Sequence, residues 1–550
     1  TVRMPAWLAL AIALLLSGCT KPNSEDSAAM ATPTPPIANT LFGQLQGDWA
    51  DTAQRVRVFK GVPYARPPVD DLRFKPPQAP TRWQGIRNAN TFSPACWQQY
   101  SRNAFVWSRG EFARSEDCLY LNIWSQAEHH EPLPVMVWFH GGAHTGGYGH
   151  VDLFDGTRLA EQGVVLVTIN YRLGPWGFLA HPALSAESSH NSSGNYGLMD
   201  KIAALNWVRD NIGAFGGDAD NVTIFGQSAG SSSVCALMAS PLSEGLFHKA
   251  IGQSAACLYP PGADTDGQTR GQALATAALK ISGISSKETI TADTLRDIDN
   301  QTLLEAVDAS GWAAQSRIVV DGWVLPEPAA DVFNAGRQAK VPVLLGSAAN
   351  EGHLLFPLNK DLSRVDLDAY LTKTFGSLSA EVANAYAQEL RVSPGFAQRE
   401  ISTDLFMAYG MRDWAGHMHR ARVETYLYFM EHVPPAFQIY LASEPNLDLP
   451  EGPRSVGAYH SGDLVYVFNN LDLFAIEWSD EDRAMAHAIS GYWTQFAKTG
   501  NPNRADLPHW PSYTADQHQT QRLDTSIETI PGARRQKLDL MQRRFSANPQ

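Results

Sequence analysis

Short apolar runs alternate with amphipathic stretches along the chain from about residue 40 onward. This alternation predicts an α/β fold, in which helices cover both faces of a central, mostly parallel sheet. No linker, repeat or low-complexity block interrupts residues 40–550, so we expect a single domain there. The expected strands are Val135–Phe139, Val164–Asn170, Val222–Phe225, Val341–Leu345 and Thr425–Phe429, and the clearest helices are expected at Leu198–Asn211 and Ala484–Lys498.

The residues before this region are expected to form a targeting segment and a tether. Arg3 precedes an apolar run, Ala6–Leu16, which has the length of a signal peptide and is too short to span a bilayer. The run leads into Leu-Ser-Gly-Cys19, which resembles a bacterial lipobox. We therefore expect a lipoprotein-type signal peptide at residues 1–18, then a lipidated cysteine and a flexible tether at residues 19–39. An ordinary secretory signal with an incidental cysteine is the alternative.

These features predict an exported protein. Thr20, rather than an aspartate, follows the lipidated position, which favours anchoring at the outer membrane, with a periplasmic or secreted protein as the alternative. The formal net charge of −13 argues against nucleic acid as a partner. Membrane contact is expected only through the lipid anchor, and the sequence indicates no oligomeric state.

The segment Gly226-Gln-Ser228-Ala-Gly230 lies between an expected strand and a small-residue stretch compatible with a helix. A serine on a sharp strand-to-helix turn is the nucleophile elbow of a hydrolase. Glycine is needed two residues before and after the serine, because side chains there would collide with the strand and the helix. Ser228 is therefore the candidate nucleophile, and a serine in an ordinary glycine-rich turn is the alternative.

A second segment, Gly252-Gln-Ser254-Ala-Ala256, nearly repeats this motif. It lacks the second glycine, and no comparable strand, turn and helix pattern surrounds it. We expect Ser254 to be structural or to support the site, and not to be a second nucleophile.

A glycine-rich loop follows the strand expected at Val135–Phe139 and reads His140-Gly141-Gly142-Ala143. Consecutive glycines let backbone N–H groups turn toward a substrate oxygen, and loops of this type supply oxyanion donors in hydrolases. We expect Gly141, Gly142 and the Ala229 N–H to form an oxyanion hole. Losing one such donor typically costs about 3–4 kcal/mol of transition-state stabilisation. A glycine-rich turn without a ligand is the alternative.

A serine nucleophile also needs a base and an acid that orients it. Glu351 follows an expected strand, where the acid belongs, although the pattern is equally consistent with a surface glutamate. His460 stands in a loop before an apolar run, but the pattern alone does not single it out among 16 histidines. His417 and His419 are expected on a solvated surface, and no His-Glu-x-x-His or Cys-x-x-Cys motif indicates a metal site.

Four cysteines remain besides Cys19. In an oxidising compartment Cys96 and Cys118 can pair, and closing that loop would contribute roughly 3 kcal/mol in the chain-entropy treatment of disulfides. Cys235, on the helix expected after the elbow, is expected to be a buried thiol. The sequence does not place Cys257.

Several separated segments, in order over most of the chain, resemble the type-B carboxylesterase and cholinesterase family of α/β-hydrolases. The Glu-Asp-Cys-Leu-Tyr-Leu-Asn segment and the elbow are the most specific of them. The matching segments are Phe59–Pro68, Leu72–Phe74, Ser115–Asn122, His140–Ala143, Thr168–Gly174, Gly194–Asp200, Ala214–Asp218, the elbow and Phe496–Pro502.

The resemblance implies an α/β-hydrolase fold and hydrolysis of small-molecule carboxylic esters through an acyl-enzyme, with no metal and no cofactor. It also implies a role for individual residues. These are Ser228 as nucleophile, Glu351 as acid, His460 as base, Gly141, Gly142 and Ala229 as oxyanion donors, Ser254 as a serine near the acid, and a Cys96–Cys118 disulfide.

Two positions depart from the family pattern. The residue before the nucleophile is usually glutamate and here is Gln227, which removes a negative charge and weakens the expected attraction for cationic substrates. Asp70 replaces a loop glycine. A choline-type esterase stays open as an alternative, because Trp107 lies in the loop where cholinesterases carry an indole that binds quaternary ammonium. Trp107 and His144 could instead line a general acyl or alcohol pocket.

A catalytically silent surface binding protein of the same fold is a further alternative. The complete set of Ser228, Glu351 and His460 argues against it, since such proteins have lost the serine.

Overall fold

The computed structural model describes residues 34–53, 55–100, 111–258, 264–284, 289–312, 318–436 and 451–547. Residues Pro36–Gln550 make up one compact unit. The expected signal peptide, Cys19 and Trp107 lie outside the described residues. Within the described ranges, no helix is both long and apolar enough to cross a membrane.

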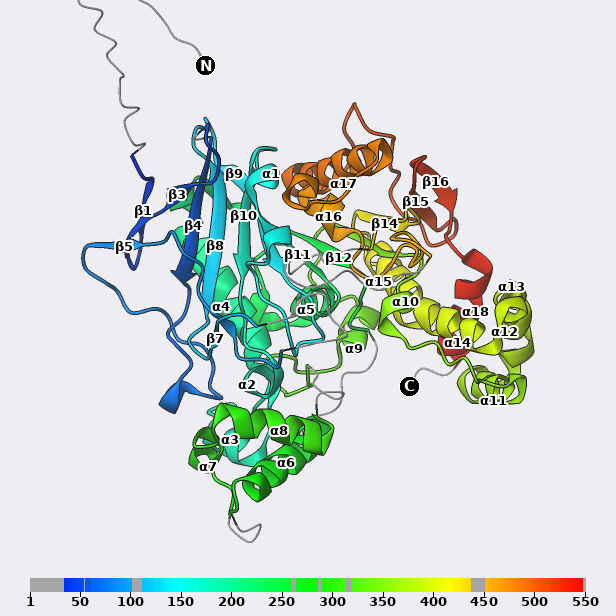
Figure 1. Ribbon diagram of the computed structural model, residues 1–550, viewed down its shortest axis with the longest axis horizontal. Helices are drawn as coiled ribbons and strands as arrows, with labels where there is room; N and C mark the ends of the chain where they lie inside the picture. Colours follow the sequence, from blue (N-terminus) through cyan, green and yellow to red (C-terminus); the bar gives the residue numbers. More distant parts are fainter. Residues whose placement is uncertain are drawn as a thin grey trace, which may run out of the picture. The chain divides into compact units, whose positions relative to one another are not determined.

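A sheet of eleven strands forms the centre of the described chain, in the order β16-β15-β14-β13-β12-β11-β9-β10-β8-β4-β3 (Figure 1). Neighbouring strands from β15 through to β10 pair in parallel, and the pairs beyond them at both ends are antiparallel. The mostly parallel sheet expected from the sequence is thus confirmed. Its strands are β3 (Asp48–Trp49), β4 (Val56–Pro63), β8 (Tyr120–Gln126), β9 (Leu133–Phe139), β10 (Val165–Ile169), β11 (Gly217–Gln227), β12 (Lys249–Gln253), β13 (Val343–Ala348), β14 (Thr425–Met430), β15 (Gln519–Leu523) and β16 (Glu528–Pro531).

Alternate residues of β9 point to opposite faces of the sheet, as the pleat of a strand requires. Val135 and Val137 belong to one hydrophobic core, whereas Met136 and Trp138 belong to another. The first core also contains residues of α4 (Tyr196–Asn211), α5 (Ala229–Ala239) and α15 (Tyr409–Arg420). The second contains residues of α1 (Thr157–Ala160), α16 (Leu464–Phe468) and α17 (Asp480–Thr499). Helices therefore cover both faces, as predicted.

The ends of the expected elements shift for local reasons. Helix α17 begins at Asp480, ahead of the apolar pattern at Ala484. Its first turn is polar because Ser479 and Asp482 form a capping box, in which each side chain accepts the other residue's backbone N–H.

The long segments between the last parallel strands add helices outside the sheet. In Figure 1 the helices α6, α7 and α8 gather near α3, and α11 to α14 gather near α18. Two small sheets complete the described elements, β1-β2-β5 and β6-β7. The remaining bounds are β1 (Ile37–Thr40), β2 (Gly43–Gln46), β5 (Ile86–Asn88), β6 (Ala95–Cys96), β7 (Arg114–Ser115), α2 (Gly174–Phe178), α3 (Pro182–Glu187), α6 (Asp264–Ile281), α7 (Ala292–Arg296), α8 (Asn300–Ser310), α9 (Ala329–Asn334), α10 (Gly352–Leu355), α11 (Arg364–Phe375), α12 (Ser379–Ala385), α13 (Ala387–Val392), α14 (Pro394–Thr403) and α18 (Arg535–Ala547).

Candidate active site

Ser228 sits on the turn between the end of β11 and the start of α5. Its backbone has φ 56° and ψ −125°, a strained conformation for a residue with a side chain. A Cβ atom on Gly226 would lie 2.5 Å from the carbonyl carbon of Gly230, and one on Gly230 would lie 1.9 Å from the carbonyl oxygen of Phe139. The predicted need for both glycines is therefore confirmed. Ser228 stays partly exposed between buried neighbours.

The glycine-rich loop after β9 passes directly against this turn. A Cβ atom on Gly141 would lie 3.1 Å from the Cβ of Ser228, and Gly142 has a φ of +108°. Neither the Gly141 nor the Gly142 N–H has a hydrogen-bond acceptor among the described residues. Ala229 is the first residue of α5, so its N–H has no acceptor within the helix either. In the described part of the chain, these three N–H groups thus have no hydrogen-bond acceptor.

Glu351 and His460, far apart in the sequence, meet in the structure. The Nδ1 atom of His460 lies 2.5 Å from Oε2 of Glu351. The other carboxylate oxygen of Glu351 accepts the Ala348 N–H at 2.7 Å. Glu351 is fully buried, so its interpretation as a surface glutamate is wrong. In the neutral ring, a proton on Nδ1 that a carboxylate accepts leaves the lone pair on Nε2, which is the atom that a general base uses.

Hydrogen bonds join the loop that carries Glu351 to the loop that carries His460. Asn350 donates its N–H to the Ala458 carbonyl at 2.9 Å, and its side-chain oxygen accepts the Ala458 N–H at 3.0 Å. The Nδ1 atom of His353 lies 2.9 Å from the Val456 carbonyl oxygen. These contacts fix the two loops in register. No sequence motif pointed to Asn350 or His353, because their partners lie about a hundred residues away.

The side chain of Gln227 contacts Nε2, the ring nitrogen of His460 that does not face Glu351. Its Nε2 atom is 3.0 Å from Nε2 of His460. Its Oε1 atom is buried, has no hydrogen-bond partner among the described residues, and lies 2.9 Å from the position of a Cβ on Gly141. Gln227 therefore lies between the glycine-rich loop after β9 and His460.

A buried polar network supports the turn from β12. The carbonyl oxygen of Gln253 accepts the Ser228 N–H at 2.8 Å, and the Gln253 side chain donates to Asp463 at 2.8 Å. The Tyr428 hydroxyl also donates to Asp463, at 3.0 Å. Burial raises the pKa of the Asp463 carboxyl to about 6. The sequence alone gave neither residue a role. Gln253 directly precedes Ser254, and Asp463 follows His460 by three residues.

The surroundings of Ser254 differ from those of Ser228. Strand β12 does precede Ser254, whose φ of 60° resembles that of Ser228, but no helix follows it directly. Ser254 is fully buried and donates its N–H to the carbonyl of Gly346 on β13, the strand that leads to Glu351. A fully buried hydroxyl cannot meet an incoming substrate.

Two histidines of the glycine-rich loop after β9, His140 and His144, make buried contacts that fix this loop. His140 stacks on Tyr171 at 4.3 Å, and the Tyr171 hydroxyl donates to the His140 carbonyl at 2.6 Å. The Nε2 atom of His144 lies 3.1 Å from both the Ala229 carbonyl oxygen and the Ser233 hydroxyl. Burial lowers the pKa of each imidazole to about 3, so both are neutral near pH 7.

His417 does not lie on a solvated surface as expected. It is buried, and burial lowers its pKa to about 4. In the part of the chain that the structure covers, no group of three or more potential ligand side chains could hold a metal ion.

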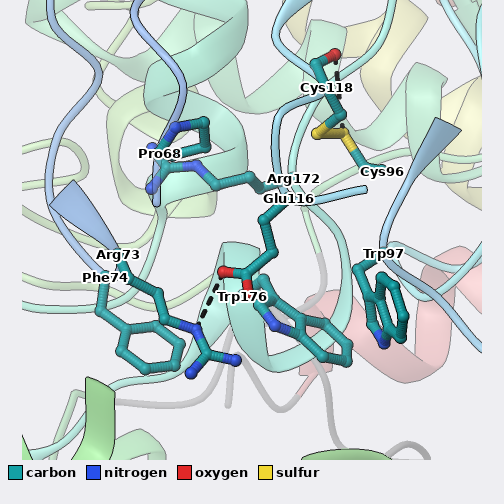
Figure 2. Close-up of a pocket in the computed structure, with 9 residues that line it drawn as sticks. All are labelled: Pro68, Arg73, Phe74, Cys96, Trp97, Glu116, Cys118, Arg172 and Trp176. Carbon is teal, nitrogen blue, oxygen red and sulfur yellow. Dashed lines mark hydrogen bonds and ion pairs between the residues drawn. A yellow bond between two sulfur atoms is a disulfide. The ribbon is translucent and has the colours of Figure 1, made fainter. Parts of the chain in front are cut away.

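Two disulfides are present. Cys96 and Cys118 are bonded, with Cα atoms 4.9 Å apart, as the resemblance implied. Figure 2 shows this disulfide beside a cavity of about 10 Å³, near the Arg73–Glu116 ion pair of 2.9 Å. Cys235 is not the free thiol expected from sequence but is bonded to Cys257. Helix α5 and the segment after β12 bring these two cysteines together, which the sequence pattern does not reveal.

Comparison with known proteins shows what the chain resembles. The family model described as "Carboxylesterase family" matches residues 34–544. The para-nitrobenzyl esterase of Bacillus subtilis is 36% identical over 522 residues, which cover 91% of this chain and 98% of that protein. The fumonisin B1 esterase of Sphingopyxis macrogoltabida is 34% identical over 505 residues, covering 87% of this chain and 84% of that protein.

Solved structures agree with these sequence matches. A PNB esterase structure superposes with a TM-score of 0.76 at 34% identity, covering 92% of this chain and 99% of that one. A carboxylesterase of Geobacillus stearothermophilus superposes with a TM-score of 0.75 at 32% identity, covering 90% and 98%. The expected α/β-hydrolase fold is thereby confirmed, and the chain belongs to the carboxylesterase family, whose members are type-B carboxylic-ester hydrolases.

Proposed function

We propose that Ser228, Glu351 and His460 are the catalytic triad of this carboxylesterase. One observation carries the proposal. A partly exposed serine on a strained turn adjoins a residue that contacts Nε2 of His460, while Nδ1 of the same ring lies 2.5 Å from a buried glutamate. Nucleophile, base and orienting acid in this arrangement define serine hydrolases across unrelated folds.

Acylation begins when the Ser228 hydroxyl oxygen attacks the ester carbonyl carbon and His460 Nε2 takes the hydroxyl proton. Glu351 holds the imidazole in the required tautomer and stabilises the charge that develops on it. The carbonyl oxygen becomes an oxyanion that accepts hydrogen bonds from the N–H groups of Gly141, Gly142 and Ala229. The carbon–oxygen bond to the alcohol then breaks, and His460 returns the proton to the departing alkoxide.

Deacylation repeats these steps with water. His460 removes a proton from water as the water oxygen attacks the acyl carbon. The oxyanion of this tetrahedral intermediate again accepts hydrogen bonds from the same three N–H groups. Its collapse releases the carboxylic acid and restores the Ser228 hydroxyl with the proton from His460. Every proton in this cycle is carried by side chains of the chain itself.

The substrates we propose are small carboxylic esters of uncharged alcohols. The side chain next to the nucleophile is the neutral amide of Gln227, which offers no negative charge to a quaternary ammonium group. This argues against the choline-type alternative. The relatives carry the names para-nitrobenzyl esterase and fumonisin B1 esterase, which fit a family that accepts varied esters. We also propose His144 as a residue of the acyl or alcohol pocket, since its ring contacts the carbonyl of Ala229 beside Ser228.

The test is turnover of p-nitrophenyl acetate, butyrate and octanoate by protein starting at Thr20, with Ser228→Ala beside it. We expect activity in the parent protein and a loss of at least about 1,000-fold in the variant, because the nucleophile is removed. Equal turnover by both proteins, or by neither, would contradict the assignment of Ser228. The order of the three esters reports the depth of the acyl pocket.

We also propose the targeting route predicted from the sequence. Residues 1–18 would be removed as a signal peptide, Cys19 would carry the lipid, residues 19–39 would serve as a tether, and residues 40–550 would be one hydrolase domain. Incorporation of a radiolabelled fatty acid that is abolished by Cys19→Ser would support the anchor. Labelling that persists in the variant would contradict it.

A further inference from the structure

The Nε2 atom of His460 already has a hydrogen-bond partner. An amide NH₂ group can only donate a hydrogen bond, so the 3.0 Å contact between the side-chain nitrogen of Gln227 and Nε2 of His460 makes Nε2 the acceptor. The ring proton is then on Nδ1, where Glu351 accepts it. The side-chain oxygen of Gln227 is correspondingly turned away, toward Gly141, and finds no donor among the described residues.

The same lone pair must take the proton of Ser228 during catalysis. Nε2 has a single lone pair in the ring plane, so Gln227 and Ser228 compete for it. A hydrogen bond donated to the lone pair stabilises the neutral imidazole and opposes its protonation. The amide of Gln227 therefore acts on the one group whose charge state decides whether the enzyme can begin a cycle.

We propose that Gln227 is a positioning residue that keeps His460 unprotonated in the resting enzyme and so extends ester hydrolysis to lower pH. The proposal rests on the triad assigned above and adds a regulatory contact to it. Gln227 itself touches the base, and it acts on the reaction only through His460.

The place of Gln227 in the fold makes this contact persistent. Gln227 is the last residue of β11 and pairs in register with Gln253 of β12. It is fully buried, and the glycine-rich loop after β9 closes over its side chain at Gly141. The amide thus has little room to leave His460, and the local competition is between two neighbouring side chains, Gln227 and Ser228.

Other titratable groups also face His460, and their influence on its protonation must be distinguished from that of Gln227. They are Glu351 on Nδ1 and Asp463 at the start of α16, with Tyr428 of β14 bonded to Asp463. Burial raises the pKa of Asp463 to about 6, but its hydrogen bonds go to Gln253 and Tyr428. A substitution at residue 227 leaves those bonds in place, so differences between variants at this position report the Gln227 contact.

The test compares the pH dependence of kcat/KM for p-nitrophenyl butyrate in the parent protein, Gln227→Met and Gln227→Glu. The acidic limb of kcat/KM reports the essential base of the free enzyme. Methionine keeps the length but removes the donor, so the limb should move to higher pH by about 0.5–1 unit. Glutamate accepts a hydrogen bond from the protonated ring, so the limb should move by more than about 1 unit. Gln44→Glu adds the same charge at an exposed position and should leave the limb unchanged.

Limbs that coincide in all four proteins, with or without a lower kcat, would overturn the proposal, because a merely structural role changes the rate and not the limb. If a variant at residue 227 is inactive, NMR titration of the His460 ring in the folded protein gives the same ordering without turnover. Loss of the triad assignment itself would appear separately, as activity retained in Ser228→Ala.

Discussion

Replacing Gly230 with alanine would place a methyl group in the contact between the elbow and β9. A Cβ atom there would lie 1.9 Å from the carbonyl oxygen of Phe139 and 2.8 Å from its carbonyl carbon. Reaching an ordinary contact of about 3.5 Å requires the turn and the strand to separate by roughly 1.5 Å. Phe139 leads directly into the glycine-rich loop, so the same displacement moves Ser228 away from the N–H groups of Gly141 and Gly142, the proposed oxyanion donors.

Two effects should follow from this separation. Overpacking of a well-filled interior costs about 1–3 kcal/mol of unfolding free energy. A misplacement of about 1 Å between catalytic groups costs on the order of 100-fold in rate. We therefore expect Gly230→Ala to lower kcat/KM for p-nitrophenyl butyrate by about 100-fold. That loss should greatly exceed what its modest loss of stability explains at 25 °C.

The assay pairs steady-state kinetics with denaturant unfolding. Gly213→Ala is the matched control, because a Cβ at Gly213 would meet nothing within 4 Å. It should keep both activity and stability. A Gly230→Ala protein with the kcat/KM and unfolding midpoint of the parent would refute the steric account of the elbow.

Three further predictions concern buried groups. Cys235→Ala should lower the unfolding free energy by roughly 3 kcal/mol, measured in urea, and should release Cys257 as a free thiol in a thiol titration. The raised pKa of Asp463, about 6 against 3.8, contributes stability that is fully present below about pH 4 and is lost as pH rises through about 6. Relative to Asp463→Asn, the parent should therefore lose about 3 kcal/mol between pH 4 and 7, and parallel unfolding curves would contradict this. Asp200→Asn removes the carboxylate that holds buried Arg172 at 2.7 Å and should cost about 3–5 kcal/mol in the same urea assay.

The sequence predicted the parts of the fold whose patterns are local. Val135–Phe139 and Thr425–Phe429 are continuous apolar runs because helices cover both faces of their strands, and both are strands in the structure. The elbow was equally predictable, because a side chain at either of its glycines would clash with the backbone of a neighbouring element. The pairing of Glu351 with His460 came from the family resemblance, because the pattern around each residue left alternatives open.

What the sequence did not predict depends on distant contacts. Strand β8 contains Asn122 and Ser125, which interrupt the apolar pattern but are buried, and Asn122 hydrogen-bonds to Gly61 and Thr168. No local pattern indicates the Cys235–Cys257 bond, because it joins a helix to a loop. The contact of Gln227 with His460 likewise joins residues that are 233 positions apart.

The most direct test of the triad is covalent labelling of the nucleophile. The parent protein should react with an organophosphate such as diethyl p-nitrophenyl phosphate and release one equivalent of p-nitrophenol. Peptide mass spectrometry should then place a single diethylphosphoryl group on Ser228, and His460→Gln should slow the labelling strongly because the general base is removed. Labelling of a different residue, or equally fast labelling of Ser228→Ala, would contradict the account.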